Sequence, residues 1–313
     1  MHEHGQGNLA TPALGSKSIG DREFALFQEL IYRSAGIHLS PARKGLLETR
    51  LAKRVRELGL ESFSAYYEYL NREGADAELR ELLDRIATNE THFFREPGQF
   101  EFLGKKIIHQ WRDDAASGER AKSIRVWSAG CATGEEPYSV AMTLLDQCPP
   151  PAGWRIEIFA TDLSSRALRA AQAAIWPIAK AKEIPPSYLK RFMLRGTGSQ
   201  QGRMKAGPEI IGAVRFDRLN LHDEVYPPIG LFDLILCRNV LIYFDARSRA
   251  AVITRLIDRL APGGYLFVGH AESLAGMNER VRYVGPTVYR YPGIEAPARS
   301  SEEPRSWEAR VYR

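Results

Sequence analysis

The stretch VWSAGCATGEEPYSVAM, residues 126–142, constrains the fold of this chain more than any other segment. Val126 and Trp127 favour a buried strand, two glycines permit a tight turn, and Pro137 suits the first turn of a helix. A strand, a glycine turn and a helix in this order form a nucleotide-type pocket at the carboxyl end of a sheet strand. We therefore expect a parallel α/β sheet with a ligand pocket at this point.

The residues after the turn argue against a phosphate-binding loop. A P-loop places Lys and then Ser or Thr after its last glycine, whereas Glu135 and Glu136 follow Gly134 here. Two carboxylates repel a phosphate but tolerate a cationic ligand, such as a sulfonium with a free amino group. The loop therefore favours S-adenosylmethionine over ATP. Gly130 and Gly134 also lack the G-x-G-x-x-G spacing, which argues against an NAD-dependent dehydrogenase.

A second part of the predicted pocket is Asp162, which ends the apolar strand that begins at Ile156. An acid at the end of the second strand can accept hydrogen bonds from both ribose hydroxyls of a nucleoside. Dinucleotide enzymes carry a similar acid about 20 residues after their glycines, so Asp162 alone does not separate the two cofactors. The alternative is that Asp162 only caps the following helix, where Ser164 suits the N-cap.

Composition and length limit the class of protein. A chain of 313 residues with 44% hydrophobic and 26% charged residues is long enough for two globular domains. A net charge of +5 does not by itself indicate a nucleic-acid partner. The three cysteines lack metal-ligand spacing, so we expect no metal and a reducing compartment. Without a long apolar span or an apolar signal sequence, we expect a cytoplasmic protein that does not insert into membranes.

Periodicity divides the chain into parts. Residues 21–90 show helical periodicity and predict a helical domain. Residues 91–294 alternate strands with helices, which predicts a doubly wound parallel sheet. The segment at about 177–212 interrupts this alternation and is expected to be an inserted loop or small β subdomain. Residues 1–20 and 295–313 are polar and are expected to be disordered tails.

The predicted second helix is basic on one side. A solvated face is the usual explanation for such a run, and a docking surface for an acidic partner is the alternative. The basic residues are Arg43, Lys44, Arg50, Lys53, Arg54 and Arg56.

Two further segments place polar residues near the predicted pocket. TNETHFFRE, residues 88–96, joins the two predicted domains, and Arg95 is either an ordinary surface charge or a donor in the site. FDLILCRNVLIYFD, residues 232–245, ends a strand where ligands bind. Arg238 either contacts a ligand there or holds a carboxylate at the strand end. Tyr243 either faces the cleft or packs against neighbouring side chains.

A third segment, VGHAES, residues 268–273, places His270 and Glu272 at the end of the next strand. A lone histidine at such a position is more often structural than catalytic.

Taken together, these motifs resemble the chemotaxis receptor methyltransferases, the CheR family of protein-glutamate O-methyltransferases. The motifs TNETHFFRE, VWSAGCATGEEPYS, FATDLS, NL, CRNVLIYFD and GHAES occur in the family order, between about Phe24 and Tyr291. The resemblance implies a Rossmann-like S-adenosylmethionine-dependent methyltransferase sheet, an all-helical N-terminal domain and a small inserted β subdomain. It also implies methyl transfer to glutamates of chemotaxis receptors, with S-adenosylhomocysteine as the product.

The resemblance assigns roles by motif position. Arg95 and Tyr243 fall at the methyl-transfer site. The correspondence allows Glu135 or Glu136 as a ligand, and Glu136 is assigned. The implied cofactor contacts are Asn89, Thr91, Arg95, Ala129, Gly130, Glu136, Asp162, Asn220, Leu221, Arg238 and Asn239.

The chemistry agrees with this assignment. A glutamyl carboxyl group has a reference pKa near ~4.3, so it is already an ionised nucleophile at neutral pH. Methylation on a sulfonium then needs positioning and desolvation rather than a general base. The implied partners are the cytoplasmic domains of methyl-accepting receptors, whose arrays recruit the enzyme to the membrane. A receptor C-terminal peptide is expected to dock on the β subdomain, whose loop carries Arg195, Gly196, Gly198, Gly202, Arg203 and Lys205.

Other methyltransferases share this fold. Amino-group methylation of nucleic-acid bases usually requires an Asn/Asp-Pro-Pro-aromatic loop, and the chain has Arg238–Leu241 there. Cytosine C5 chemistry requires a Pro-Cys nucleophile, and Cys148 instead precedes Pro149. We therefore expect no nucleic-acid partner, and keep a nucleic-acid or small-molecule methyltransferase and a non-catalytic cofactor-binding module as alternatives.

Overall fold

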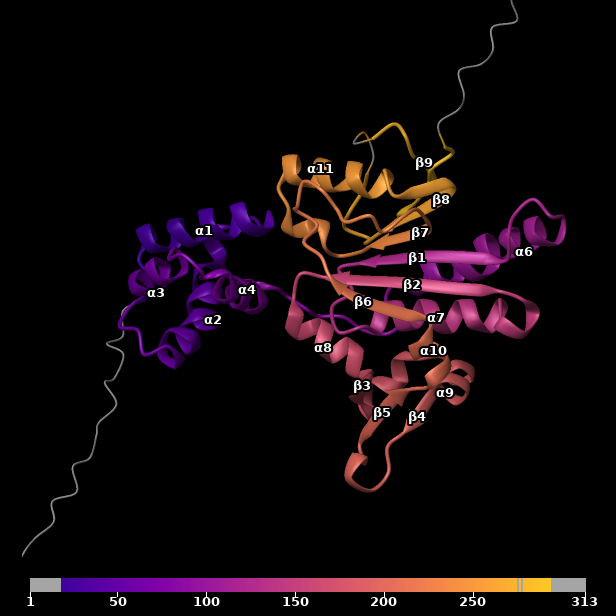
Figure 1. Ribbon diagram of the computed structural model, residues 1–313, viewed down its shortest axis with the longest axis horizontal. Coiled ribbons are helices and arrows are strands. Elements are labelled where there is room, and N and C mark those ends of the chain that lie inside the picture. Colours follow the sequence, from indigo (N-terminus) through magenta and orange to yellow (C-terminus); the bar gives the residue numbers. More distant parts are fainter. Residues whose placement is uncertain (1–17, 275, 277, 294–313) are drawn as a thin grey trace, which may run out of the picture.

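Two parts joined by a short linker make up the computed structural model, which describes residues 18–274, 276 and 278–293 (Figure 1). The first part is all helical, with four α-helices and a short 3-10 turn. Apolar side chains at helical spacing meet in its core, where Phe27, Leu51 and Tyr66 are fully buried. The elements are α1 (Asp21–Ala35), η1 (Pro41–Arg43), α2 (Lys44–Glu57), α3 (Phe63–Leu70) and α4 (Asp76–Ile86).

The packed structure begins before the expected boundary at residue 21. Ile19 is fully buried in the helical core, and its backbone amide donates to Glu48 over 3.2 Å. Residues 1–17 and 294–313, which cover most of the expected tails, lie outside the described residues.

The basic side chains of α2 do not form one solvated face. Lys44 pairs with Asp21 at 2.6 Å, and Arg54 pairs with the buried Glu78 at 2.5 Å. Arg50 of α2 and Arg43 of the preceding turn η1 line a cavity between the two domains. The sequence could not show this division, because the partners come from other helices and from the second domain.

The second part is a seven-stranded sheet with the order β6-β2-β1-β7-β8-β10-β9. The strands from β6 to β8 are parallel, and β10 and β9 form an antiparallel hairpin at the edge. The chain winds outward from β1 through β2 to β6 and then crosses back to β7. The strands are β1 (Ser123–Ala129), β2 (Arg155–Asp162), β6 (Val214–Arg218), β7 (Phe232–Cys237), β8 (Leu260–Val268), β9 (Arg282–Gly285) and β10 (Val288–Arg290).

This topology puts a switch point between β1 and β7, where ligands bind in doubly wound sheets. Successive residues of β1 point to opposite faces, so Val126 enters one core and Trp127 the other. The predicted fold class is confirmed. Strand β8 begins at Leu260, so Pro262, Gly263 and Gly264 lie inside the strand.

Helices cover both faces of the sheet (Figure 1). The linker leads directly into α5, whose first residue is Pro97. The helices are α5 (Pro97–Phe102), the π-helix η2 (Leu103–Ile107), α6 (Ile108–Ala116), α7 (Glu135–Gln147), η3 (Pro150–Ala152), α8 (Ser165–Ala173) and α11 (Ala246–Ile257).

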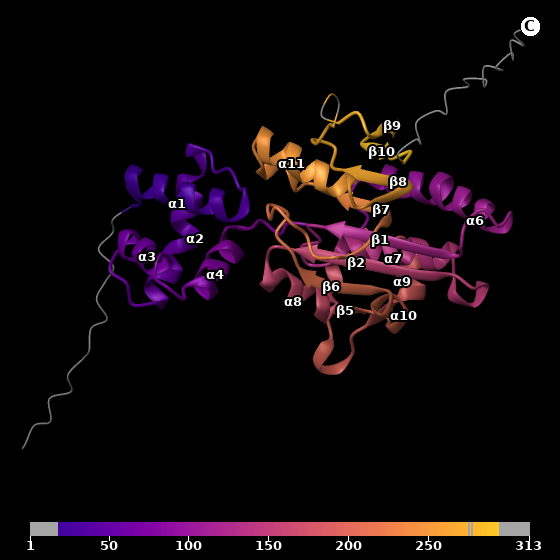
Figure 2. The same ribbon diagram turned by 45° about the horizontal axis from the view of Figure 1, so that its top comes forward.

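The inserted segment forms the predicted β subdomain, which projects from the edge of the sheet nearest β6 (Figures 1 and 2). Its three strands are antiparallel in the order β3-β5-β4. Trp176 and Met204 are buried partners across β3 and β5. The elements are β3 (Ile175–Pro177), η4 (Ile178–Glu183), α9 (Pro186–Phe192), β4 (Met193–Arg195), η5 (Gly198–Gln200), β5 (Arg203–Ala206) and α10 (Pro208–Gly212).

The described residues include no helix that is both long and apolar enough to span a membrane.

A buried carboxylate allows a test of the helical domain. Burial alone would raise the pKa of Glu78, but hydrogen bonds from Arg54 and Tyr66 prevail and hold that pKa below its usual value. We expect Glu78→Gln to lower the free energy of unfolding by about 1–3 kcal/mol at neutral pH. Because the folded pKa is depressed, this contribution is lost as the pH falls, so the difference from wild type should narrow from about pH 5 toward pH 3.

Urea unfolding of the full chain, followed by far-ultraviolet circular dichroism, measures this difference. A difference of equal size at both ends of the pH range would contradict the assigned role of the Glu78 charge.

Candidate active site

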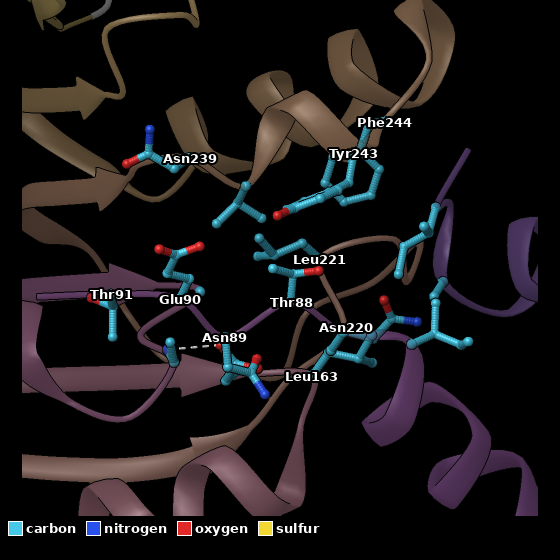
Figure 3. A pocket seen from close by; sticks show the side chains of 18 of the residues that line it. Thr88, Asn89, Glu90, Thr91, Leu163, Asn220, Leu221, Asn239, Tyr243 and Phe244 are labelled. Carbon is cyan, nitrogen blue, oxygen red and sulfur yellow. Dashed lines mark hydrogen bonds between the residues drawn. The ribbon is translucent and has the colours of Figure 1, made fainter. Parts of the chain in front are cut away.

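A cavity lies at the carboxyl ends of the central strands, between the sheet and the helical domain (Figure 3). It encloses about 1180 Å³ of space, including the solvent at its mouth. The helical domain, the linker and the loops after β1, β2, β6 and β7 all contribute to its wall. The polar and glycine residues of the wall are Arg43, Arg50, Thr88, Asn89, Glu90, Thr91, Arg95, Gly130, Glu136, Asp162, Asn220, Arg238, Asn239 and Tyr243.

The glycine turn after β1 forms the floor of the cavity. Gly130 has a φ of 87°, and the backbone amides of Gly130 and Cys131 both donate to the Thr161 carbonyl, at 2.7 and 2.9 Å. A Cβ atom on Gly130 would lie 2.3 Å from Val240, so only glycine allows the two loops to meet. Ala129, an implied cofactor contact, is fully buried in the core and does not line the cavity.

Asp162 enters the cavity from the end of β2. Its carboxylate accepts the Ala132 amide at 2.8 Å and the Ser164 amide at 2.8 Å. Burial raises the pKa of this carboxyl group, and the backbone donors oppose that effect. Ser164, not Asp162, caps the next helix, because its hydroxyl accepts the Ala167 amide. Each carboxylate oxygen keeps acceptor capacity for a ligand in the cavity.

The structure separates the roles of the two glutamates that begin α7. Glu136 lines the cavity and accepts the Ser128 hydroxyl at 2.7 Å. Glu135 turns away from it and is ion-paired with Lys180 of η4, which ties α7 to the inserted subdomain. Burial raises the pKa of Glu136, and the Arg238 guanidinium opposes this. Of the two, only Glu136 is available to a ligand.

Arg238 is buried between two carboxylates at the end of β7. Its side chain is 1% exposed and lies 3.1 Å from Glu136 and 3.2 Å from Glu96. It also donates to the Arg95 carbonyl. These contacts favour the structural interpretation of Arg238, which fastens the linker and the start of α7 to the sheet.

The following residue, Asn239, has a φ of 60°, a strained conformation for a residue other than glycine. Ala132, which lines the cavity, shares the left-handed region with Phe94 and Glu96, the two neighbours of Arg95 in the linker. Such strain persists only where surrounding contacts hold it, and it is common at functional sites. The Asn239 side-chain oxygen is buried and has no hydrogen-bond partner among the described residues.

The linker places Asn89, Thr91 and Arg95 on the cavity wall (Figure 3 labels the first two). The Asn89 amide lies 3.4 Å from the Ser164 hydroxyl, and Arg95 donates to the Glu90 carbonyl at 3.3 Å. Phe93 packs in the core against Trp176. Arg95 is half-buried and hydrogen-bonded, so it is not an isolated surface charge.

Tyr243 reaches the cavity from η6 (Leu241–Tyr243), the turn that follows Asn239 (Figure 3). The Arg43 guanidinium lies over the Tyr243 ring, 5.4 Å from the ring centre. The backbone carbonyl of Tyr243 accepts the His38 amide at 2.8 Å. Asn220 and Leu221 also line the cavity, but the Asn220 amide already donates to Ser34 and Asp223. The helical domain therefore contacts both Tyr243 and the loop after β6.

The helical domain supplies a part of the cavity wall that the sequence does not predict. Arg50 donates to the Ile86 carbonyl and, at 3.3 Å, to the Thr88 hydroxyl, so it braces the linker. No local pattern marks such residues as part of a site, because they become its wall only when the two domains dock.

The fold, the cavity and the matching family models together define a methyltransferase with a helical domain over its ligand site. Residues 89–290 match the family model described as "CheR methyltransferase, SAM binding domain", and residues 22–87 match "CheR methyltransferase, all-alpha domain". The chain is 36% identical to the chemotaxis protein methyltransferase of Escherichia coli K12, over 91% of this chain and 96% of that protein. It is also 36% identical to that of Borreliella burgdorferi, over 86% of this chain and 93% of that protein. The chain belongs to the CheR methyltransferase family.

The position of Asp162 gives a binding prediction. We expect Asp162→Ala to weaken the binding of S-adenosylhomocysteine by roughly 1.5–3 kcal/mol, as for a lost hydrogen bond to a charged group. Titration calorimetry measures this, with Asp217→Ala as the control because Asp217 is exposed on the neighbouring strand β6. Unchanged affinity in a folded Asp162 variant would remove this residue from the ligand site.

Proposed function

We propose that this protein transfers the methyl group of S-adenosylmethionine to glutamate side chains in the cytoplasmic domains of chemotaxis receptors. The products are glutamate methyl esters and S-adenosylhomocysteine, and the reaction serves adaptation in chemotaxis signalling. The observation that carries the proposal is the cavity at the switch point, whose wall combines Asp162, Glu136 and Asn239 with Arg95 and Tyr243. The relatives named chemotaxis protein methyltransferase support the substrate class.

The residues of the cavity fit S-adenosylmethionine. Asp162 would accept the ribose hydroxyls, and the floor at Gly130 leaves room for close approach. Glu136 and the unpaired Asn239 oxygen would accept from the cationic amino group. When bound, S-adenosylmethionine supplies an electrophilic methyl group on a sulfonium.

The linker, the loop after β6 and Arg238 complete the proposed cofactor site. Asn89, Thr91, Asn220 and Leu221 would contact the cofactor from the wall. Arg238 would act mainly through Glu136, because both of its terminal NH2 groups already contact Glu136, Glu96 or the Arg95 carbonyl.

Arg95 and Tyr243 are the proposed methyl-transfer residues. A receptor glutamate arrives ionised, so these residues need to orient its carboxylate and exclude water. A tight bidentate pair with arginine would lower the reactivity of the carboxylate. Among the described residues, the Arg95 guanidinium makes one hydrogen bond, to the Glu90 carbonyl at 3.3 Å, which leaves other donors to orient a substrate.

The decisive experiment uses methyl-labelled S-adenosylmethionine and membranes that contain chemotaxis receptors. We expect base-labile label on receptor glutamates. Label on added nucleic acid or on a small molecule would instead support another methyltransferase, and binding without transfer would support a non-catalytic module. Label that resists base would overturn the ester assignment.

Tyr243 separates binding from chemistry. We expect Tyr243→Phe to leave affinity for S-adenosylhomocysteine nearly unchanged while it lowers kcat, because the hydroxyl lines only the methyl path. Arg95→Ala should weaken both, since Arg95 would touch both ligands. Tyr283→Phe, on the exposed strand β9, is the control. Equal losses of affinity and kcat in Tyr243→Phe would make Tyr243 a binding or folding residue.

We further propose that the β subdomain binds a peptide at the C-terminus of the receptor, which tethers the enzyme within the receptor array. β4 is an edge of the three-stranded sheet, and Leu194 on it is 54% exposed. An extended peptide can add to such an edge through backbone hydrogen bonds. Arg195 on β4 and Arg203 on β5, whose carbonyl accepts the Gly196 amide at 2.9 Å, are both exposed, which suits a terminal carboxylate.

A tether acts through effective concentration, which reaches about the millimolar range for short linkers. We therefore expect Arg203→Glu, or deletion of the receptor tail, to slow methylation at low receptor concentration and to matter little at saturation. Lys105→Glu is the control, because the Lys105 side chain on η2 is 77% exposed and lies outside the β subdomain. Failure of peptide copies of the candidate receptor tails to bind this protein would contradict the tether.

A further inference from the structure

The GHAES motif after β8 contains a buried carboxylate, Glu272, that the proposed chemistry does not use. Glu272 is 2% exposed and lies at the end of a turn in which its own amide donates to the Gly269 carbonyl at 2.8 Å. Its Oε2 atom accepts the Gly269 amide and the Asn239 amide, both at 2.7 Å. Its Oε1 atom accepts the Ile242 amide at 3.2 Å.

Backbone amides, not a cation, satisfy this charge. Burial raises the pKa of Glu272, and the backbone amides of Gly269, Asn239 and Ile242 act against that effect. The amides come from two places, the turn itself and the loop after β7. A buried carboxylate that is held by backbone donors of another segment fixes that segment, because each unmade hydrogen bond would leave a desolvated charge.

The segment that Glu272 fixes carries the proposed site residues. Asn239 and Ile242 lie within the loop of residues 238–243, so the carboxylate holds the residue immediately before Tyr243. A Cβ atom on Gly269 would lie 2.8 Å from both the Asn239 nitrogen and Glu272 Oε2. The glycine is therefore needed for the carboxylate to reach the left-handed Asn239.

The same turn also contacts the linker. The His270 amide donates to Glu96 Oε1 at 3.1 Å, and Glu96 directly follows Arg95. The turn at residues 269–272 is thus hydrogen-bonded to residues that adjoin both proposed methyl-transfer residues. Glu272 accepts the backbone amide of Ile242, next to Tyr243, and the His270 amide donates to the side chain of Glu96, next to Arg95.

We infer that Glu272 is a positioning residue for methyl transfer, which holds the loop of residues 238–243 so that Tyr243 faces the methyl path. The inference rests on the proposed function, and it adds a residue that does not line the cavity. Glu272 acts only through the loop and touches neither ligand.

A glutamine at this position cannot replace the carboxylate. Oε2 faces two N–H donors and Oε1 faces one, whereas an amide group has one acceptor oxygen and one donor nitrogen. Either orientation of the amide turns its NH2 group toward a backbone N–H. Glu272→Gln therefore releases the loop without removing side-chain volume.

A double-mutant cycle tests the action through Tyr243. We expect Glu272→Gln to lower kcat for receptor methylation by about tenfold or more, as for loss of a charged hydrogen bond. In the Tyr243→Phe background the same change should cost less than about threefold, because residues that act through one another are not additive. Equal fold-losses in both backgrounds, or an unchanged kcat, would overturn the inference.

Hydrogen exchange gives a readout that needs no activity. In Glu272→Gln, the amides of Asn239 and Ile242 should exchange about tenfold faster or more, while those of β8 stay protected. Unchanged exchange in the loop would overturn the inference even if the receptor is methylated. If the wild-type protein methylates no receptor but Glu272→Gln still shows faster exchange in the loop, the result would support the role of Glu272 in holding the loop and refute the proposed function.

Two further variants separate positioning from stability. Glu78→Gln also removes a buried carboxylate, but from the helical domain, so its effect on kcat should not depend on Tyr243. If Glu272→Gln fails to fold, Glu272→Asp keeps the charge and shortens the reach, and it should show the same dependence on Tyr243. A Glu272→Asp loss of kcat that is equal in both backgrounds would refute the inference.

Discussion

The buried guanidinium of Arg238 is the contact on which the site depends. It joins the end of β7, the first turn of α7 through Glu136, and the linker through Glu96 and the Arg95 carbonyl. A charge removed from water is costly unless it is paired and hydrogen-bonded. These three segments therefore have to meet at one point, and that point is the wall of the cavity. The backbone strain at Glu96 and Asn239 lies next to this contact.

The local signals in the sequence predicted the sheet and the position of the site well. Alternating strands and helices gave the parallel sheet, and the switch point follows from chain order alone. The carboxyl ends of parallel strands lie at one edge of the sheet, so chain order alone predicts that Gly130, Asp162 and Asn239 lie close together. All three line one cavity. Their contacts with a cofactor remain a prediction.

The finer roles depended on long-range packing. Nothing local distinguishes Glu135 from Glu136, and Lys180, which pairs with Glu135, belongs to the inserted subdomain. From the sequence alone, Arg50 would be interpreted as a surface charge, because the groups that accept its hydrogen bonds lie far along the chain, on α4 and the linker. Motif position also assigned Ala129 to the cofactor, whereas its side chain packs in the core and is not part of the cavity wall.

The cavity wall has a thermodynamic consequence for how the two domains are held together. Leu47, Arg50 and Ile86 of the helical domain share this wall with Asp162 and Asn239 of the sheet domain. A ligand that contacts both sides binds only the docked arrangement, so part of its binding free energy adds to the stability of docking. Conversely, any partner that draws α2 away from the sheet must weaken the hold on that ligand by the same coupling free energy.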